Sequence, residues 1–209
     1  MQRRIRTFSK NVSQVYKRRE EIVDCAIALF IKNGYDRTSM RELADAFGKT
    51  KGGIYHYFGS KEDILYLILT ETTQHRGIVL EEIRERIKHM KPLEALKETI
   101  RLHMKSVDEA QDRFIFINHV MVNLSKEERK LVFDSGNSNV KFFEDLLRWG
   151  VEEGSFEIEA PHFLAHIINT CCVDWAIRRW SLRTTYTLEE YTDRIIKTAL
   201  TMIKINNSQ

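Results

Sequence analysis

Residues 49–64 read KTKGGIYHYFGSKEDI, and this stretch differs from the rest of the chain. It places three lysines, the glycine pair Gly52–Gly53 and the aromatic run Tyr55–Phe58 within a few helical turns. Glycine inside a helix costs about 1 kcal/mol relative to alanine, so its use here calls for a reason. A partner that approaches the backbone closely would provide one.

A helix drawn through this stretch has two distinct sides. Ile54 and Phe58 fall on one side, where they would pack inward, and Lys49, Gly52 and His56 fall on the other. The second side combines a cation, a bare backbone and an imidazole. The major groove of DNA admits a helix, and its phosphates accept hydrogen bonds from such groups. The pattern therefore predicts a DNA-recognition helix.

The flanking residues predict a helix before and a helix after this one. Ser39 and Glu42 form a capping box for a short helix that ends at Gly48. Ser60 begins a long helix running to about Met90, and Lys61 lies in its first turn, where the helix dipole disfavours a cation. A bound phosphate would relieve that conflict. Two short helices separated by a glycine turn indicate a helix-turn-helix.

The segment TSMRELADAFGKTKGGIYHYFGSKEDIL, residues 38–65, resembles the DNA-binding signature of the TetR family of bacterial transcriptional regulators. The resemblance extends over residues 20–65. It departs from the family at Lys49, where a small apolar residue is usual, and at Gly53, where Thr or Ser is common.

The resemblance implies roles for individual residues. Those matching base-facing positions are Thr50, Lys51 and Gly52. Those matching phosphate-contacting positions are Ser39, Tyr55, His56, Tyr57 and Lys61, with Thr38 beside them. Lys49 belongs to the same outward face. Two alternatives stay open, because Tyr57 also suits core packing and His56 also suits an idle surface position.

Charge is distributed unevenly along the chain. Residues 1–61 hold 13 basic and six acidic side chains, whereas the remainder is net acidic, and the total is +3. A basic N-terminal module on an acidic body indicates a polyanionic partner for that module, here double-stranded DNA. We therefore divide the chain into a flexible basic arm (1–16), a helix-turn-helix DNA-binding domain (17–65) and a body (66–209).

Helical periodicity covers nearly the whole chain and predicts an all-α fold of about nine helices. The family resemblance implies that the body binds a ligand and forms the dimer. RFIFINHVMVNL (113–124) is apolar around most of its circumference and should be buried, and aromatic residues including Phe133 follow on the next helix. Most of these are core residues, and the set expected to line an effector cavity is Phe116, Phe142, Trp149 and Trp175.

A helix expected over residues 160–181 carries apolar residues on two opposite faces, which fits a pocket on one side and a partner subunit on the other. With the last helix it would form an intersubunit four-helix bundle. The tract from residue 151 to 200 is also similar to regulators of fatty-acid or steroid breakdown that release DNA on binding an acyl-CoA. That resemblance implies contacts from Arg178, Arg179 or Arg183 to CoA phosphates, although surface ion pairs are an equal alternative.

Other classes of function lack support in the sequence. Nucleophile motifs, phosphate-binding glycine loops and paired catalytic carboxylates are missing, so we expect no enzyme and no cofactor. His162 and His166 have a two-ligand metal spacing but no convincing third ligand. The three cysteines form neither a disulfide framework nor a zinc spacing, and no apolar run suits a membrane span or signal peptide, so we expect a cytoplasmic protein.

The sequence as a whole predicts a homodimeric transcriptional repressor that binds a pseudo-palindromic operator and is released by a hydrophobic effector, an acyl-CoA by resemblance. Another hydrophobic effector, such as a drug or free fatty acid, is the first alternative. An architectural DNA-binding protein without effector is the second.

Overall fold

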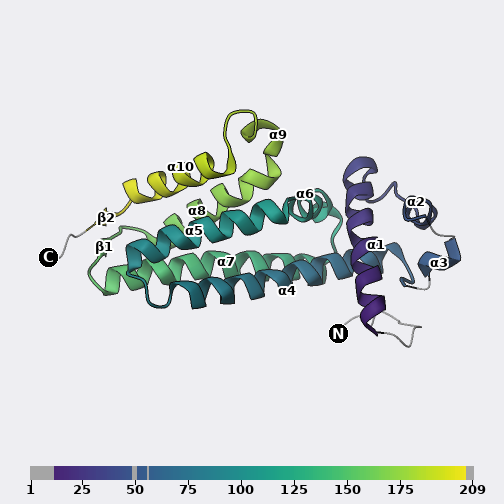
Figure 1. Cartoon of the computed structure of the whole chain (residues 1–209), viewed down its shortest axis with the longest axis horizontal. Coiled ribbons are helices and arrows are strands. Elements are labelled where there is room, and N and C mark those ends of the chain that lie inside the picture. Colours follow the sequence, from purple (N-terminus) through teal and green to yellow (C-terminus); the bar gives the residue numbers. More distant parts are fainter. Residues whose placement is uncertain (1–11, 49–50, 56, 206–209) are drawn as a thin grey trace.

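The computed structural model describes residues 12–48, 51–55 and 57–205. Within these ranges the chain forms ten α-helices, one short 3₁₀-helix and a pair of two-residue strands. Three helices gather at one end, and an elongated body of lengthwise helices makes up the rest (Figure 1). The predicted all-α fold is confirmed.

The small end of the molecule is built from the first helices of the chain. These are α1 (Val12–Asn33), α2 (Met40–Ala46), α3 (Lys51–Tyr55) and the start of α4 (Lys61–Ile87). Because α1 begins at Val12, it takes in residues 12–16, which the sequence assigned to a flexible arm. The helix runs through because residues 12–33 contain neither glycine nor proline. The rest of the predicted arm lies outside the described residues.

The body contains the remaining helices. They are α5 (Pro92–Glu109), α6 (Gln111–Val120), the 3₁₀-helix η1 (Met121–Asn123), α7 (Lys126–Glu152), α8 (Pro161–Ile177), α9 (Arg179–Leu182) and α10 (Leu188–Thr201). Helices α4, α5, α7 and α8 lie along one another in the body, and α10 covers α5 and α8 (Figure 1).

Helix starts follow the capping signals in the sequence. Capping boxes form between Ser39 and Glu42 at α2, Ser125 and Glu128 at α7, and Thr187 and Glu190 at α10. Each cap satisfies backbone N–H groups that the helix leaves free, and losing one typically costs about 1 kcal/mol. Proline occupies the first turn of α5 and of α8, where its missing N–H costs no helical hydrogen bond.

Two hydrophobic cores meet along α4. One joins α1–α3, the first turns of α4 and, from the body, Phe116, Ile117, Val120 and Leu124. The other joins the rest of α4 with α5, α7, α8 and α10. Helix α6 therefore packs with the small end of the molecule although it follows α5 in sequence. It does so because it is apolar on nearly every side and can fill a second core.

A small strand pair closes the far end of the body. Strand β1 (Phe156–Glu157) pairs antiparallel with β2 (Lys204–Ile205), and Lys204 Nζ lies 2.6 Å from a Glu157 carboxylate oxygen. The Phe156 ring packs against Gly150, where an added Cβ would come within 2.1 Å of the ring. The sequence analysis did not predict these strands.

Two expectations for the body are corrected. The helix expected over 160–181 is split, because Arg178 adopts φ −106° and ψ 28° between α8 and α9. Phe133, expected in the core, is 53% exposed. The inward stripe of α7 runs instead through Ser135, Asn139 and Phe143, and a helical residue off such a stripe faces solvent.

Candidate DNA-binding surface and effector cavity

The predicted helix-turn-helix is present. Leu43 and Ala44 bury one face of α2, and Ile54 and Phe58 are 0% and 1% exposed, as the helical phasing predicts. The turns on either side of α2 contain Gly34 and Gly48, whose φ angles of 87° and 67° suit glycine. The outward face of α3 is thereby left free of the core.

Four of the predicted DNA-contacting residues lie together. A surface hollow of about 380 Å³ is lined by Thr38, Ser39, Tyr55 and Lys61, among others. Tyr55 is 39% exposed. The sequence analysis missed Arg37, which lines the same hollow and adds a second cation beside Lys61. Its only signal was a basic residue directly before Thr38.

Thr38 and Ser39 also hold the local backbone. The buried Thr38 hydroxyl donates to the Gly34 carbonyl over 2.8 Å, and Ser39 Oγ accepts from the Glu42 backbone N–H over 3.2 Å. The Ser39 cap lowers the pKa of the Glu42 carboxyl through hydrogen bonds from the Ser39 backbone and side chain. The edge of the hollow is therefore fixed before any ligand arrives.

Lys61 makes a specific set of contacts. Its Nζ donates to the Tyr35 and Asp36 carbonyls over 2.7 and 3.2 Å and lies 4.4 Å from the centre of the Tyr35 ring. These contacts place its charge at the start of α4 beside the hollow.

The other predicted DNA-contacting residues are less fully described. Lys49, Thr50 and His56 lie outside the described residues, and for Lys51 and Gly52 only the helical backbone is described. Tyr57 is half-buried and packs against the core of the small end.

The six residues predicted to bind the effector are spread over two regions. Phe116 is 1% exposed and stacks on Phe30 in the core of the small end, with ring centres 5.3 Å apart. Phe142, Trp149 and Trp175 belong to the core of the body.

Two of the three predicted arginines, Arg179 and Arg183, contact the turn between α5 and α6. Arg179 Nη1 donates to Asp112 over 2.7 Å, and Arg183 pairs with Asp108, which also accepts from Trp175 Nε1 over 2.8 Å. Arg178 pairs with Asp174 within its own helix. Trp175, Arg179 and Arg183 thus meet at one turn, and each contacts an acidic residue there.

The body also contains a cavity of about 550 Å³ between α4, α5, α6 and α7. Its apolar lining comes from Ile78, Val79, Leu80, Ala110 and Phe114. None of the six predicted effector residues lines it, but Ala110 belongs to the same α5–α6 turn that Arg179 and Arg183 contact from the other side.

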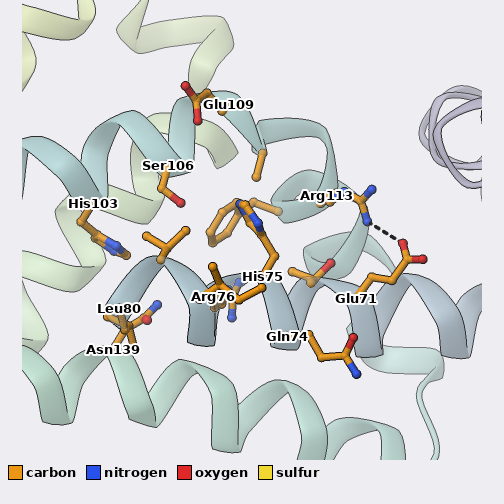
Figure 2. Close-up of a pocket in the computed structure, with 15 residues that line it drawn as sticks. Glu71, Gln74, His75, Arg76, Leu80, His103, Ser106, Glu109, Arg113 and Asn139 are labelled. Atoms are coloured by element: carbon orange, nitrogen blue, oxygen red, sulfur yellow. Dashed lines mark hydrogen bonds and ion pairs between the residues drawn. The ribbon is translucent and has the colours of Figure 1, made fainter. Parts of the chain in front are cut away.

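Polar side chains also line this cavity, and the sequence analysis missed them. His103 and Ser106 of α5 face α4, where Arg76 lies, and Asn139 of α7 joins them (Figure 2). Burial, together with repulsion from Arg76, lowers the pKa of His103 to about 4, and burial lowers the pKa of Arg76 to about 10. At neutral pH Arg76 is therefore a guanidinium cation and His103 a neutral imidazole.

Arg113 connects the cavity to the small end of the molecule. It lines the cavity from α6, and its guanidinium lies 3.4 Å from Glu71 of α4 (Figure 2). The same guanidinium lies 3.4 Å from Asp24 of α1. A molecule that moved Arg113 would therefore act directly on α1.

Two further features bear on function. His162, considered above for a metal site, contacts a Glu144 carboxylate oxygen over 2.8 Å, and no metal-type cluster of three His, Cys, Asp or Glu occurs among the described residues. In the same part of the chain, no helix has both the length and the apolar character that a bilayer crossing requires.

Comparison with known proteins agrees with this arrangement. Residues 22–66 match the model described as bacterial regulatory proteins, tetR family, and residues 89–203 match the tetracyclin repressor-like C-terminal domain. The chain belongs to the TetR family. The resemblance found in the sequence is confirmed, and this TetR-family chain is a transcriptional regulator.

Individual relatives span both parts of the regulator. HbdR, an HTH-type transcriptional regulator from Aromatoleum sp. (strain CIB), is 26% identical over 179 residues, covering 86% of this chain and 77% of HbdR. The HTH-type transcriptional repressor KstR2 of Mycobacterium tuberculosis is 28% identical over 144 residues, covering 68% and 71%.

Solved structures share the fold. The ketosteroid regulator KstR2 of M. tuberculosis aligns with a TM-score of 0.77 at 21% identity, covering 97% of this chain and 100% of that one. AibR, solved with isovaleryl coenzyme A and operator DNA, aligns with a TM-score of 0.71 at 24% identity, covering 87% and 97%.

Proposed function

We propose that this TetR-family regulator is a homodimeric repressor that binds a pseudo-palindromic operator and releases it on binding an acyl-CoA. The observation that carries the proposal is the cavity in the body, whose lining residue Arg113 also pairs with Asp24 of α1. A ligand bound in the cavity can therefore change the orientation of the DNA-binding helices through this contact. An architectural protein would have no use for such a connection.

The DNA-binding part of the proposal rests on the hollow beside α3. Its cations and its fixed edge suit a phosphate backbone. The glycine pair Gly52–Gly53 of the sequence suits close approach of α3 to the major groove. The roles proposed above for Lys49, Thr50, Lys51, Gly52 and His56 rest on the sequence.

The dimer part rests on an uncovered apolar face. On α8 and α10 the exposed or half-buried residues include Phe163, Ile167, Cys171, Tyr191 and Met202, and several of them line a groove of about 150 Å³. Two such faces brought together would form the intersubunit helix bundle expected from the sequence.

The acyl-CoA part rests on the α5–α6 turn and on two relatives. Arg179 and Arg183 lie on one side of this turn, while residues of the turn line the cavity on the other. An acyl chain in the cavity would leave a CoA moiety near these arginines, whose guanidinium groups suit phosphate oxygens. AibR was solved with isovaleryl coenzyme A, and FadR from Bacillus subtilis, which shares the fold, was solved with stearoyl-CoA.

The proposal is tested by titrating octanoyl-CoA, octanedioyl-CoA, octanoate and free CoA against the complex of the full-length protein with its operator. We expect a thioester to release DNA and free CoA to leave it bound.

Arg179→Ala should weaken the effect of thioesters alone, and Arg86→Ala, which removes an exposed arginine paired with Glu98, is the matched control. If octanoate releases DNA as well as the thioesters do, the arginines do not hold CoA. If no compound binds the protein or releases DNA, the proposed function is wrong.

A further inference from the structure

We propose that the effector presents a carboxylate to Arg76 inside the cavity. The inference rests on the proposed function, because it concerns the ligand of the same cavity. It specifies the chemistry of the part of the effector that is buried there.

Arg76 is a cation on the inward side of α4, and the described part of the chain offers it no anionic partner. Its Nη1 donates to Ser135 Oγ over 3.2 Å, its guanidinium lies 4.6 Å from the centre of the Phe114 ring, and its Nε is buried with no hydrogen-bond partner. No acidic side chain pairs with it among the described residues. A guanidinium has five N–H donors, so Arg76 can donate to a ligand through groups that the Ser135 contact does not use.

The two acidic residues that line the cavity are already engaged elsewhere. Glu71 lies 3.4 Å from Arg113, and Glu109 lies 3.8 Å from Lys105. The Glu109 side chain is also 62% exposed, at the surface of the molecule. Neither carboxylate therefore neutralises Arg76.

The neighbours of Arg76 suit the same ligand group. The His103 imidazole is buried and neutral, and Asn169 lies beside it. Within the described residues its Nε2 has no hydrogen bond of good geometry. Asn139 is 3% exposed and lines the cavity with Ser106. A carboxylate accepts hydrogen bonds only, so it can receive them from a guanidinium, an imidazole N–H, an amide and a hydroxyl at once. A saturated hydrocarbon end would leave all of these groups unsatisfied.

The number of charges favours a carboxylate over a phosphate. Arg76 is the one cation of the lining without an acidic partner in the described part of the chain, since Arg113 is paired twice. A single planar guanidinium matches the two oxygens of a carboxylate. The apolar lining from Ile78 to Leu80 and at Phe114 then takes the hydrocarbon part of the effector.

Two sources can supply this carboxylate, and two pairs of probes separate them. Octanoate and octanol differ in the carboxylate of a free acid. Octanedioyl-CoA and octanoyl-CoA differ in a carboxylate at the far end of a thioester-linked chain. Calorimetric titration of the full-length protein should show, in one pair, at least tenfold tighter binding of the member with the carboxylate.

Arg76→Met should abolish this preference and leave the thermal unfolding temperature unchanged or higher, because it removes an unpaired buried charge. Arg84→Met removes an exposed arginine from the same helix and should keep the preference. The inference is overturned if neither pair shows a preference in the wild-type protein, or if Arg76→Met retains it. The wild-type comparison needs no variant to fold. Release of operator by both thioesters, with no carboxylate preference in the binding of either pair, would leave the proposed function standing and remove this inference alone.

Discussion

At the scale of single residues, Lys61 shows how one side chain can serve the fold and the ligand. Its Nζ donates to the Tyr35 and Asp36 carbonyls and so braces the turn between α1 and α2. The lysine also lines the hollow that we assign to the DNA backbone. A phosphate bound in the hollow would compete with the two carbonyls for the Lys61 ammonium group. It would compete well, because a full negative charge attracts a cation more strongly than a carbonyl dipole does.

We expect Lys61→Ala to weaken binding to operator and to random duplex by the same factor. The slope of log K against log salt should fall by about 0.9 for the one phosphate contact that is lost. Lys197→Ala, which removes an exposed lysine from α10, is the control. Fluorescence anisotropy over a salt series measures both quantities. A lower unfolding temperature with an unchanged salt slope would mean that Lys61 serves the turn alone.

Residue patterns also show what the sequence could and could not predict. Capping residues act on their own helix, so the capping box of Ser39 with Glu42 was predicted correctly. Arg76 and His103 were missed because each sits on an otherwise apolar helical stripe, Arg76 seven residues after Leu69 and His103 seven after Leu96. A cation on an apolar stripe can indicate a binding site. Whether it does depends on a cavity that other helices form, and the sequence of one helix does not show that cavity.

At the scale of elements, α4 links the small end to the cavity. It contributes Ile64 and Leu65 to one core and Ile83 and Ile87 to the other, and Arg76 lies between them. Gly77 follows Arg76 in the middle of this helix, and a Cβ added there would meet nothing within 4 Å. Packing therefore does not require glycine at position 77, and glycine makes the interior of a helix more flexible.

We expect Gly77→Ala to raise the free energy of unfolding by about 0.5–1 kcal/mol, because alanine favours the helix. It should also raise the effector concentration needed to release DNA, if α4 bends on release. Gly136→Ala in α7 is matched, since its Cβ would also meet nothing within 4 Å. Chemical denaturation and operator release measure the two effects. Equal shifts of the release curve by both variants would exclude a specific role for Gly77.

Some features of the helices could be predicted from the sequence and others could not. Helices α2 and α3 were placed correctly because their ends carry glycine and serine signals. The break between α8 and α9 has no glycine or proline, and directly after it Arg179 pairs with Asp112 of α6. The packing of α6 with the small end is likewise a long-range contact that no local pattern encodes.

At the scale of the whole molecule, the exposed apolar face of α8 and α10 predicts that the protein is a dimer. Phe163→Glu places a charge on that face and should shift the protein toward monomer. Phe133→Glu is the control, because Phe133 is comparably exposed, 53% against 56%, but lies on α7. Sedimentation velocity at micromolar concentration decides between the outcomes. A wild-type monomer, or equal dissociation by both variants, would contradict this assignment.

The central claim is that cavity and operator are coupled within one dimer. The most direct test is calorimetric titration of the full-length protein with the tighter-binding of octanoyl-CoA and octanedioyl-CoA, without and with saturating operator. Because coupling between two sites is reciprocal, operator should raise the Kd of the thioester by the same factor by which the thioester raises the Kd of operator. A thioester that binds with the same Kd in the presence and absence of operator would contradict the account.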